Sequence, residues 1–525
     1  MTTAQTPRIA VLGAGSSGLV TLKCLNEYFP ASAVTCFEKG NTVRGAWGSR
    51  GEDFVSTSTK YTTQFSCFQE VPQAVAHHEP YGEFFRGGEY GDYLERFVEH
   101  FKLRQQIAFG VEVRSIKFVA PKWELLLKGP NGEFTQTFDA IFICTGLVSR
   151  PRKLSVSDSR IRVQETPEGI RDSRVVVVGG GESAVDVANT LARAELGNTV
   201  FLSLRSGIRV SPRYHPIRKV PSDFLRNRLL LSVDKRWRNA IGERFVTFRI
   251  KHRKLLEALF PKSRREMRET SGGSNAGWEL RLMSRARNEL FNVFHNKSDA
   301  FLQAVTEGRI TIVGPPVDDS FQSFFDFEQT EQVSIAPQVV VPSAGYYPLL
   351  ETLSAGALAL KDFYLGCLHS TLPNCFLIGH ARPVIGNIPT MSELQAKYCS
   401  GLLAGRFARP VDIVPQTETQ WLELTREFPS INTQCIYPVE HIPYCDLLAK
   451  AMGIYPTRRA LGSLRLWLKW LLAPASTSHY LDQDFDRPML ETQPIHMPAV
   501  LALLVGAIRL FQTQVELMGK GRSIR

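Results

Sequence analysis

Short runs of consecutive apolar residues recur along the chain, bounded by glycine or polar residues. They occupy residues 9–12, 33–37, 138–147, 174–178, 199–204, 338–347 and 375–379. Runs of this length predict strands that are buried on both faces, as in a parallel sheet. Residues 91–101, by contrast, carry apolar side chains at helical spacing, and residues 111–128 predict two strands separated at Ala120-Pro121. The pattern indicates an α/β fold.

The first apolar run leads into a glycine-rich turn, Gly13-Ala14-Gly15-Ser16-Ser17-Gly18, with a helix expected from near Leu19. The spacing G-x-G-x-x-G is typical of dinucleotide-binding loops, in which the glycines permit a tight turn, close approach of a pyrophosphate and close helix packing. The motif alone is weak, because glycine turns also end ordinary strands. Glu38 strengthens it, since this carboxylate ends the next strand, about twenty residues further on, where it would accept hydrogen bonds from a ribose.

A second loop of the same kind follows four consecutive valines. It reads Gly179-Gly180-Gly181-Glu182-Ser183-Ala184, and the helix after it includes Asp186. The next strand ends in Arg205, not in a carboxylate, with Arg209 and Arg213 close behind. An arginine at this position pairs with the 2′-phosphate of NADP, so we predict that the second site prefers NADPH.

Two further stretches are candidates for the wall of a site. The indole in Gly45-Ala46-Trp47 would cover a flavin or adenine ring, or would simply anchor its loop. Residues 54–72 mix hydroxyl and aromatic side chains, which suits contact with a polar ring system; the alternative is a threonine-rich strand with one solvated face.

Composition narrows the classes of protein. The chain has 525 residues, of which 43% are hydrophobic, and Lys and Arg exceed Asp and Glu by 62 to 51. This balance suits phosphate-bearing ligands or an anionic membrane surface, although a merely basic surface is the alternative. The basic, helical stretch 226–268 has no interleaved array of aromatic residues, so we expect no nucleic-acid partner. Nine cysteines without a CxxC or Cys/His cluster predict no metal site and favour a reducing, cytoplasmic setting.

No segment predicts export or membrane insertion. The N-terminus lacks a hydrophobic signal core, and the apolar run 499–508 falls short of the ~20 residues that a spanning helix requires. Residues 461–472 predict a helix that is docked or interfacial, with docking favoured. We expect a cytoplasmic protein. The alternative is a protein that contacts the membrane surface peripherally through its C-terminal helices.

Together these motifs resemble the flavin-containing monooxygenases, the class B single-component flavin monooxygenases, from about Arg8 to Arg406. Gly13, Gly15, Gly18 and Glu38 resemble the family's FAD fingerprint, and Ala46-Trp47 resembles its flavin-side loop. Residues 56–60 with Phe65 and Phe68 are similar to its segment beside the flavin, and residues 380–383 with 393–396 to its closing segment. The resemblance thus implies a cofactor-binding set of Gly13, Ala14, Gly15, Ser16, Ser17, Gly18, Glu38, Ala46, Trp47, Ser58, Gly179, Gly181, Ser183, Ala184, Asp186, Arg205 and Gln395.

The resemblance also implies the domain order. We expect two Rossmann-like dinucleotide-binding domains, with the NADPH domain inserted in the FAD domain, and a helical C-terminal extension. The expected boundaries are 1–165 and 316–410 for the FAD domain, 166–315 for the NADPH domain with its basic helical insertion, and 411–525 for the extension. The chain would leave the first domain near Glu165 and return by Val339.

The implied function is that of an NADPH- and FAD-dependent monooxygenase. NADPH reduces FAD, dioxygen forms a flavin C4a-(hydro)peroxide, and one oxygen atom enters a small organic substrate, with N- or S-oxygenation of a soft nucleophile expected. Ser56 and Thr57 are the expected catalytic contacts near the flavin edge and the nicotinamide, and Thr57 stands where the family usually has asparagine.

The sequence departs from the family pattern at one further place. Residues 150–175 lack the F-x-G-x-x-x-H motif that is expected before the second glycine loop. Baeyer-Villiger oxidation of a ketone and a non-catalytic cofactor-binding regulatory protein are therefore the alternatives. An NADPH-disulfide oxidoreductase is excluded, because it requires a redox CxxC.

Overall fold

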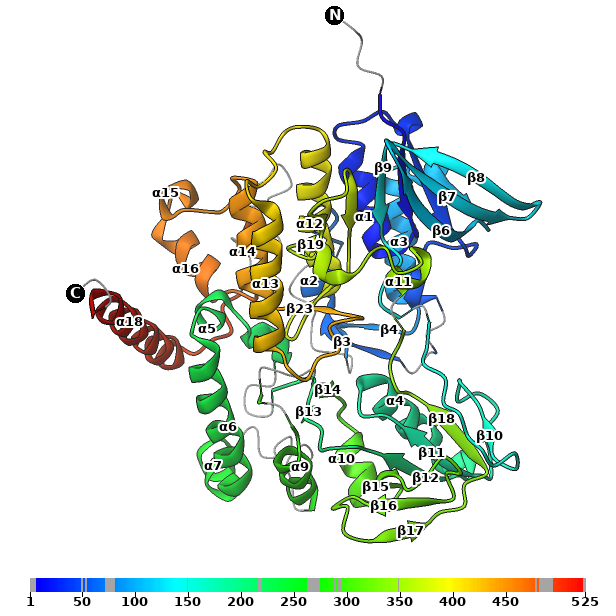
Figure 1. Ribbon diagram of the computed structural model, residues 1–525. Coiled ribbons are helices and arrows are strands. Elements are labelled where there is room, and N and C mark those ends of the chain that lie inside the picture. The colour runs from blue at the N-terminus through cyan, green and yellow to red at the C-terminus, as the bar shows by residue number, and fades with distance from the viewer. Residues whose placement is uncertain are drawn as a thin grey trace, which may run out of the picture. The chain divides into compact units, whose positions relative to one another are not determined.

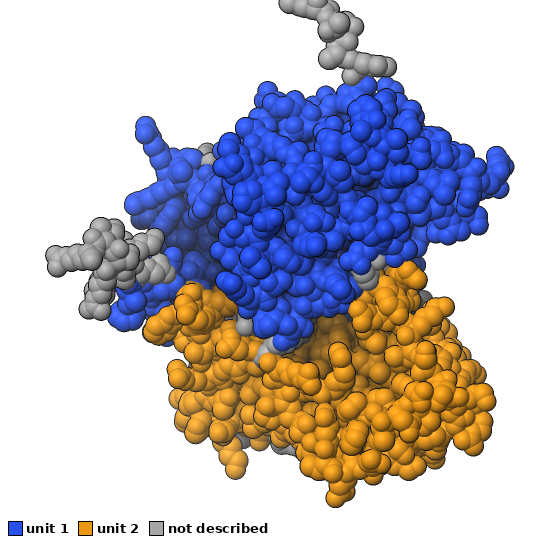
Figure 2. All heavy atoms as spheres, in the orientation of Figure 1, with its two compact units in different colours: residues 1–149, 223–233, 348–525 blue, residues 150–222, 234–347 orange. Residues whose placement is uncertain are grey.

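The structure is a computed structural model that describes residues 6–48, 51, 54–70, 81–148, 150–215, 220–261, 274–287, 289–290, 295–347, 349–476, 479–480 and 494–522. The chain forms two compact units, coloured separately in Figure 2. The first comprises residues 1–149, 223–233 and 348–525, and the second comprises residues 150–222 and 234–347. Each unit contains a seven-stranded sheet, which confirms the α/β class.

The sheet of the first unit has the strand order β19-β20-β21-β9-β1-β2-β5. Figure 1 labels β9 and β19 of this sheet. Its parallel part consists of β21 (Cys375–Leu377), β9 (Ala140–Ile143), β1 (Ile9–Leu12), β2 (Val34–Glu38) and β5 (Ile107–Phe109). Two short antiparallel strands, β19 (Phe363–Tyr364) and β20 (Leu368–His369), extend it beyond β21. The opening strand β1 therefore lies inside the sheet, with β9 and β2 as its neighbours.

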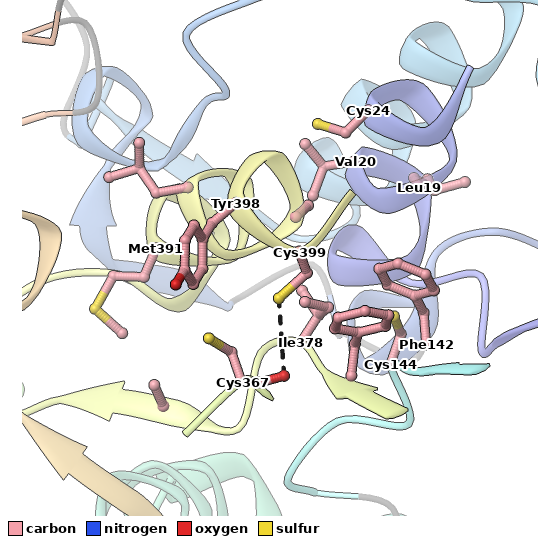
Figure 3. Close-up of a cluster of buried hydrophobic side chains, with 14 of the residues drawn as sticks. Leu19, Val20, Cys24, Phe142, Cys144, Cys367, Ile378, Met391, Tyr398 and Cys399 are labelled. Atoms are coloured by element: carbon pink, nitrogen blue, oxygen red, sulfur yellow. Dashed lines mark hydrogen bonds between the residues drawn. The ribbon is translucent and has the colours of Figure 1, made fainter. Parts of the chain in front are cut away.

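Both faces of β1 are covered, because its alternate residues enter two different cores. Ile9 and Val11 face the core that contains α1 (Ser16–Leu25) and α12 (Ile388–Leu403). Figure 3 shows side chains of these two helices gathered with Phe142 of β9, and the Cys399 thiol donating to the Cys367 carbonyl at 3.7 Å. Ala10 and Leu12 face the core under the three-stranded antiparallel sheet β6 (Glu112–Val119), β7 (Lys122–Gly129) and β8 (Gly132–Phe138). This two-sided burial explains the unbroken apolar run.

The rest of the first unit consists of a set of helices and two pairs of short strands, β3 with β4 and β22 with β23. The elements are β3 (Val55–Thr59), α2 (Lys60–Thr63), β4 (Phe84–Arg86), α3 (Glu89–His100), α5 (Arg228–Leu231), α11 (Leu349–Leu353), β22 (Ala381–Pro383), α13 (Ile413–Glu427), β23 (Tyr437–Val439), α14 (His441–Ala451), α15 (Arg458–Leu461), α16 (Leu464–Leu472) and α18 (Ala499–Arg522). Helix α16 buries Leu466 and Trp470 against Leu461, which confirms that this segment is docked along one face. No helix in the described part of the chain is long and apolar enough to cross a membrane. Membrane contact by α18, which exposes Val500, Leu503 and Leu510, stays a prediction.

The sheet of the second unit has the strand order β10-β18-β11-β12-β15-β16-β17. Its strands are β10 (Arg162–Val163), β18 (Val339–Pro342), β11 (Arg174–Val178), β12 (Thr199–Ser203), β15 (Ile310–Pro316), β16 (Ser323–Asp326) and β17 (Gln332–Ser334). Val175 and Val177 pack against α4 (Glu182–Leu191) and α10 (Phe301–Thr306), whereas Val176 enters a separate core with Phe324 on the other face. The remaining elements are β13 (Val210–Ser211), α6 (Lys235–Lys251), α7 (Arg253–Leu259), α9 (Ser274–Ser284) and β14 (Asn296–Lys297).

The expected return of the chain to the first domain by Val339 is wrong. Strand β18 lies parallel to β11, with Val339 opposite Val175, so it belongs to the second sheet. Residues 338–347 have an apolar run followed by a glycine. A strand of either sheet would show this pattern, so the sequence does not indicate to which sheet the strand belongs. Apart from segment 223–233, the chain returns to the first unit at residue 348, and residues 150–165 and 316–347 lie with the second glycine loop. The short segment 223–233 belongs to the first unit, where Leu231 packs against Ile442 and Ala475.

Candidate cofactor sites

The first glycine loop has the geometry that its sequence predicts. Gly13 has a φ of +99°, and its N–H donates to the Phe37 carbonyl at 2.8 Å across the carboxyl edge of the sheet. A Cβ on Gly13 would lie 2.9 Å from the Cys144 carbonyl oxygen. A Cβ on Gly18 would lie 1.8 Å from the Gly13 carbonyl oxygen, so helix and strand approach as closely as two backbones can. Any side chain at either position would disrupt the turn.

Helix α1 begins at Ser16, three residues before the expected start at Leu19. Gly15 is its N-cap, in extended conformation, and no side chain caps the amides of the first turn. These amides and the helix dipole suit an anionic phosphate. The buried Ser17 hydroxyl, by contrast, lies 3.0 Å from that of Ser392, so it joins α1 to α12 within the core.

Glu38 is fixed at the end of β2 by two backbone amides. The Ala14 N–H donates to Oε2 and the Gly40 N–H to Oε1, each at 2.8 Å. Each carboxylate oxygen has a second lone pair, which remains suited to a ribose hydroxyl. A 2′-phosphate at the same place would be repelled.

Ala46 and Trp47 lie next to this loop, in a single turn of 3-10 helix. The turn approaches the glycine loop closely, since a Cβ on Gly45 would lie 3.1 Å from the Gly15 Cα. Trp47 packs against Tyr90 with 4.7 Å between ring centroids, and against Phe54 at 5.7 Å. The indole therefore anchors its loop at the cofactor end of the sheet.

A buried polar atom next to the first loop fits a bound cofactor. Thr145 follows β9, and its Cα would lie 3.6 Å from a Cβ on Gly13. Its hydroxyl is buried, with no hydrogen-bond partner in the described part of the chain. Buried hydroxyl groups are normally bonded, so an adjacent polar ligand would satisfy Thr145.

The two expected catalytic hydroxyls lie on β3, which pairs antiparallel with β4, and they have different environments. Ser56 is 2% exposed, and its hydroxyl donates to the Ser58 carbonyl at 2.6 Å and accepts from the Phe85 N–H at 3.0 Å. These bonds hold β3 against β4. Thr57 and Ser58 are partly exposed on the same strand. Thr57, rather than Ser56, is thus the candidate for contact with a ligand.

The closing segment is buried and heavily bonded. The Gln395 Oε1 accepts the Gly379 N–H at 2.9 Å, and its Nε2 donates to the Tyr444 hydroxyl at 2.7 Å. Glu393 accepts both the Ser66 N–H, at 2.9 Å, and the Ser66 hydroxyl, at 2.8 Å. Both ends of the Gln395 amide are thus engaged within the protein, where they fix the middle of α12 against Gly379 and α14.

The second glycine loop repeats the first in outline. Gly179 has a φ of +145°, its N–H donates to the Ser203 carbonyl at 3.2 Å, and a Cβ would lie 2.2 Å from the Ser343 carbonyl oxygen. Gly181 is the N-cap of α4 and faces open space. In the first turns of α4, Ser183 is exposed, Ala184 is buried in the core and Asp186 is half-buried. The loop therefore offers an uncovered helix start, as a phosphate site requires.

Three arginines follow β12, and they have different environments. Arg209 is buried and pairs with Glu243 at 2.5 Å, and Arg213 is buried and pairs with Asp299 at 3.3 Å. Arg205, at the end of the strand, is exposed and forms no ion pair with the described residues. Only Arg205 is therefore placed to meet a ligand phosphate.

No group of three or more His, Cys, Asp or Glu residues in the described ranges is arranged to hold a metal ion. All nine cysteines are free thiols. Burial raises the pKa of the Cys144 thiol to about 12, so this side chain stays protonated and packs as a buried core residue.

Sequence reasoning missed the part that segment 223–233 plays in the first unit. Asp223 accepts the Thr59 N–H at 2.9 Å and the Thr62 hydroxyl at 3.2 Å, next to the expected flavin-side strand. Arg228 is buried, pairs with Asp446 at 2.6 Å and lies over the Trp470 ring at 4.1 Å. The segment is too short to be assigned to one unit from its sequence.

The chain matches the family model described as flavin-binding monooxygenase-like over residues 6–271. It is 30% identical over 491 residues to dimethylaniline monooxygenase [N-oxide-forming] 4 of Rattus norvegicus, with 86% of this chain and 79% of that protein covered. It is 24% identical over 473 residues to 4-hydroxybenzoate brominase (decarboxylating) of Pseudoalteromonas luteoviolacea, with 85% of this chain and 84% of that protein covered. The closed crystal structure of cyclohexanone monooxygenase matches with a TM-score of 0.58 at 17% identity, and the match covers 86% of this chain and 98% of that chain. At this identity the match shows a similar fold.

The two sheets, each with a glycine loop at the carboxyl edge, define a protein that binds two dinucleotides. The chain belongs to the flavin-binding monooxygenase-like family. It is an NADPH-dependent flavin monooxygenase whose cofactors are FAD and NADPH, and which acts on dioxygen and a small organic molecule. The family, enzyme class and cofactors expected from the sequence are confirmed.

Proposed function

We propose that this enzyme transfers one oxygen atom of dioxygen to the nitrogen or sulfur of a small soft nucleophile. The observation that carries the proposal is the 30% identity to an N-oxide-forming relative over 86% of the chain. The first unit is proposed to bind FAD and the second NADPH, because Glu38 suits a free ribose hydroxyl whereas Arg205 suits a 2′-phosphate.

When bound, FAD supplies the redox chemistry by accepting hydride from NADPH and reducing dioxygen. The protein's own residues bind the cofactors and orient the reacting groups. The glycine loops and the uncapped starts of α1 and α4 hold the phosphates, and Glu38 fixes a ribose. Thr57 is proposed to place its hydroxyl at the reacting edge of the flavin. Ser56 and Asp223 hold strand β3 in place, and Asn387 holds helix α2 through the Thr62 carbonyl.

The test is a substrate panel with purified holoenzyme. A thioether, a tertiary amine and a cyclic ketone are each incubated with NADPH, and both NADPH consumption and product are measured. We expect a sulfoxide or an N-oxide in proportion to the NADPH consumed. Ester from the ketone, with neither of the other products, would overturn the proposal in favour of Baeyer-Villiger oxidation.

The role of Thr57 has its own test. Thr57→Ala should lower the fraction of NADPH consumption that yields product, because the hydroxyl that orients the reacting groups is lost. Thr135→Ala, at an exposed position on β8, is the matched control. Unchanged coupling in Thr57→Ala would remove this residue from the site.

A further inference from the structure

Helices α6 and α7 of the second unit, drawn in green in Figure 1, have no part in the cofactor sites described above. On α6 the usual distribution of side chains is inverted. The side that faces the protein buries three polar residues, Arg238, Asn239 and Arg249. The side that faces solvent carries four large apolar residues, each between 40% and 46% exposed: Trp237, Ile241, Phe245 and Phe248. A helix that only covers its own core shows the opposite pattern.

The buried polar side of α6 is fixed by ion pairs and hydrogen bonds. Arg249 pairs with Glu279 of α9 at 2.5 Å, and the Asn239 amide donates to the Glu289 carboxylate at 2.5 Å. Glu243 pairs with the buried Arg209 at 2.5 Å. Turning the helix would leave buried charges unpaired, which is costly. The apolar face of α6 therefore points outward in the folded protein.

The exposed apolar residues form one continuous face of α6. They are spaced by four, four and three residues, which places them on the same side of a helix. The exposed Arg244 and Lys251 lie beside this face, because they stand four residues before and three residues after Phe248. Helix α7 adds exposed side chains of the same two kinds. We call this set the α6–α7 surface: Arg236, Trp237, Ile241, Arg244, Phe245, Phe248, Lys251, Lys254, Leu255 and Leu259.

The exposed ionised side chains of the α6–α7 surface are all basic. Residues 234–260 contain eight Lys and Arg residues and three acidic residues, and none of the acids belongs to the exposed class. Asp234 is the N-cap of α6 and lies 3.5 Å from Arg236, and the buried Glu257 lies 3.1 Å from Arg253. The third acid, Glu243, is held by Arg209. The surface therefore presents apolar side chains and uncompensated positive charge together.

This combination distinguishes between possible occupants. A second copy of the chain, packed by the same surface, would bring like charges together, which is repulsive. An anionic lipid bilayer offers negative headgroups to the cations, and its acyl boundary accepts the apolar side chains. Tryptophan, phenylalanine and leucine beside lysine and arginine are typical of helices that lie in this boundary. Charge and apolar character thus favour the same partner.

We propose that the α6–α7 surface docks on an anionic lipid bilayer, with α6 lying in the plane of the membrane surface. Its apolar side chains enter the headgroup boundary, while Arg244 and Lys251 pair with lipid phosphates and carboxylates. No helix has to cross the bilayer, and none in the described part of the chain is long and apolar enough to do so. The contact is distinct from one through α18, and it does not depend on which substrate the enzyme oxygenates.

The test measures binding of the holoenzyme to sedimented vesicles. One preparation is phosphatidylcholine alone, and the other is phosphatidylcholine with phosphatidylserine at a ratio of about 7:3. The flavin absorbance of the pellet reports the bound fraction. We expect the holoenzyme to bind the anionic vesicles at least about tenfold more tightly than the neutral ones, and added salt to weaken this binding. Equal binding to both preparations, or binding to neither, overturns the proposal.

Two double variants separate the apolar contribution from the charged one. Phe245→Gln with Phe248→Gln should weaken binding to anionic vesicles by about tenfold, because the side chains that enter the bilayer are lost. Arg244→Gln with Lys251→Gln should bring binding to anionic vesicles close to that of neutral ones. All four positions are exposed, so both variants should keep the flavin content of the wild type. Should a variant fold poorly, the two vesicle preparations still decide with the wild type.

Controls test the location of the contact. Phe134→Gln on β8 and Lys117→Gln on β6 change exposed residues of the same types elsewhere and should bind vesicles as the wild type does. Leu503→Gln with Phe511→Gln alters α18. Loss of binding in this α18 variant, with binding retained in both α6 variants, would place the contact on α18 and overturn the proposal. So would a wild-type dimer, seen by light scattering without lipid, that the aromatic α6 variant dissociates, because the surface would then bind a second copy.

Discussion

The backbone N–H of Ala14 donates a 2.8 Å hydrogen bond to the carboxylate of Glu38. These residues are separated by a helix and a strand, yet this bond fixes the acid at the mouth of the glycine loop. The second unit has no such acid, because its corresponding strand β12 ends at Ser203 and is followed by Leu204 and the exposed Arg205. This single difference is the basis of the proposal that FAD binds at the first loop and NADPH at the second.

Glu38→Ala should weaken FAD binding by about tenfold or more, because it removes the ribose contact and leaves two amides unsatisfied. The measurement is the FAD-to-protein ratio after dialysis, with affinity from reconstitution of the apoprotein. Glu133→Ala, at an exposed position on β8, is the control. Full FAD retention by Glu38→Ala would contradict the assignment.

Gly179→Ala and Gly181→Ala should fail in different ways. A Cβ at Gly179 would lie 2.2 Å from the Ser343 carbonyl oxygen at a φ of +145°, so the substitution should cost on the order of 2 kcal/mol of unfolding free energy. Gly181 faces open space, so its variant should fold normally but show a raised KM for NADPH, because the methyl group occupies the place of the pyrophosphate. Thermal melts and steady-state kinetics separate the two effects. Equal melting temperatures would show that the Gly179 contact is not strained.

Arg205→Gln should raise the KM for NADPH by about tenfold and leave the KM for NADH nearly unchanged, since only NADPH carries the 2′-phosphate. The KM of Arg205→Lys for NADPH should lie between the values of the wild type and Arg205→Gln. Arg171→Gln, at an exposed position of the same unit, serves as the control. If the NADPH-to-NADH preference of Arg205→Gln equals that of the wild type, another group binds the phosphate.

Acid should destabilise the protein between about pH 6.5 and pH 4. Burial lowers the pKa of His380 to about 4, whereas an unfolded histidine titrates near 6.5. The unfolded chain therefore binds more protons in this window, so the free energy of unfolding falls as the pH falls, by about 3 kcal/mol for this group at full effect. Thermal melts from pH 8 to pH 5 measure it.

His380→Gln should flatten the pH dependence, because the amide does not titrate. His100→Gln, at an exposed position on α3, should leave the slope as it is. The same slope in His380→Gln and the wild type would place the acid sensitivity elsewhere, with His441 the next candidate since its pKa is also lowered to about 4.

Local signals allowed much of the fold to be predicted. The sequence predicts the strands at Ile9 and Val175 and both glycine turns, because an apolar run and the spacing of glycines within a turn are local features of the chain. The placement of Val339 was wrong, since pairing partners are set by the whole sheet. In the site, the sequence indicated the hydroxyl-rich strand but did not show that Ser56 and Gln395 bond within the protein. Nor did it bring Asp223 to Thr59 and Thr62, because this contact joins segments about 160 residues apart in the chain.

The most direct test of the proposed oxygenation uses ¹⁸O₂. The holoenzyme is incubated with NADPH, a thioether and ¹⁸O₂ in ordinary water, and the product is analysed by mass spectrometry. We predict a sulfoxide with one ¹⁸O atom per molecule, and about one NADPH consumed for each sulfoxide formed. NADPH consumption that yields only hydrogen peroxide, or a sulfoxide whose oxygen comes from water, would contradict it.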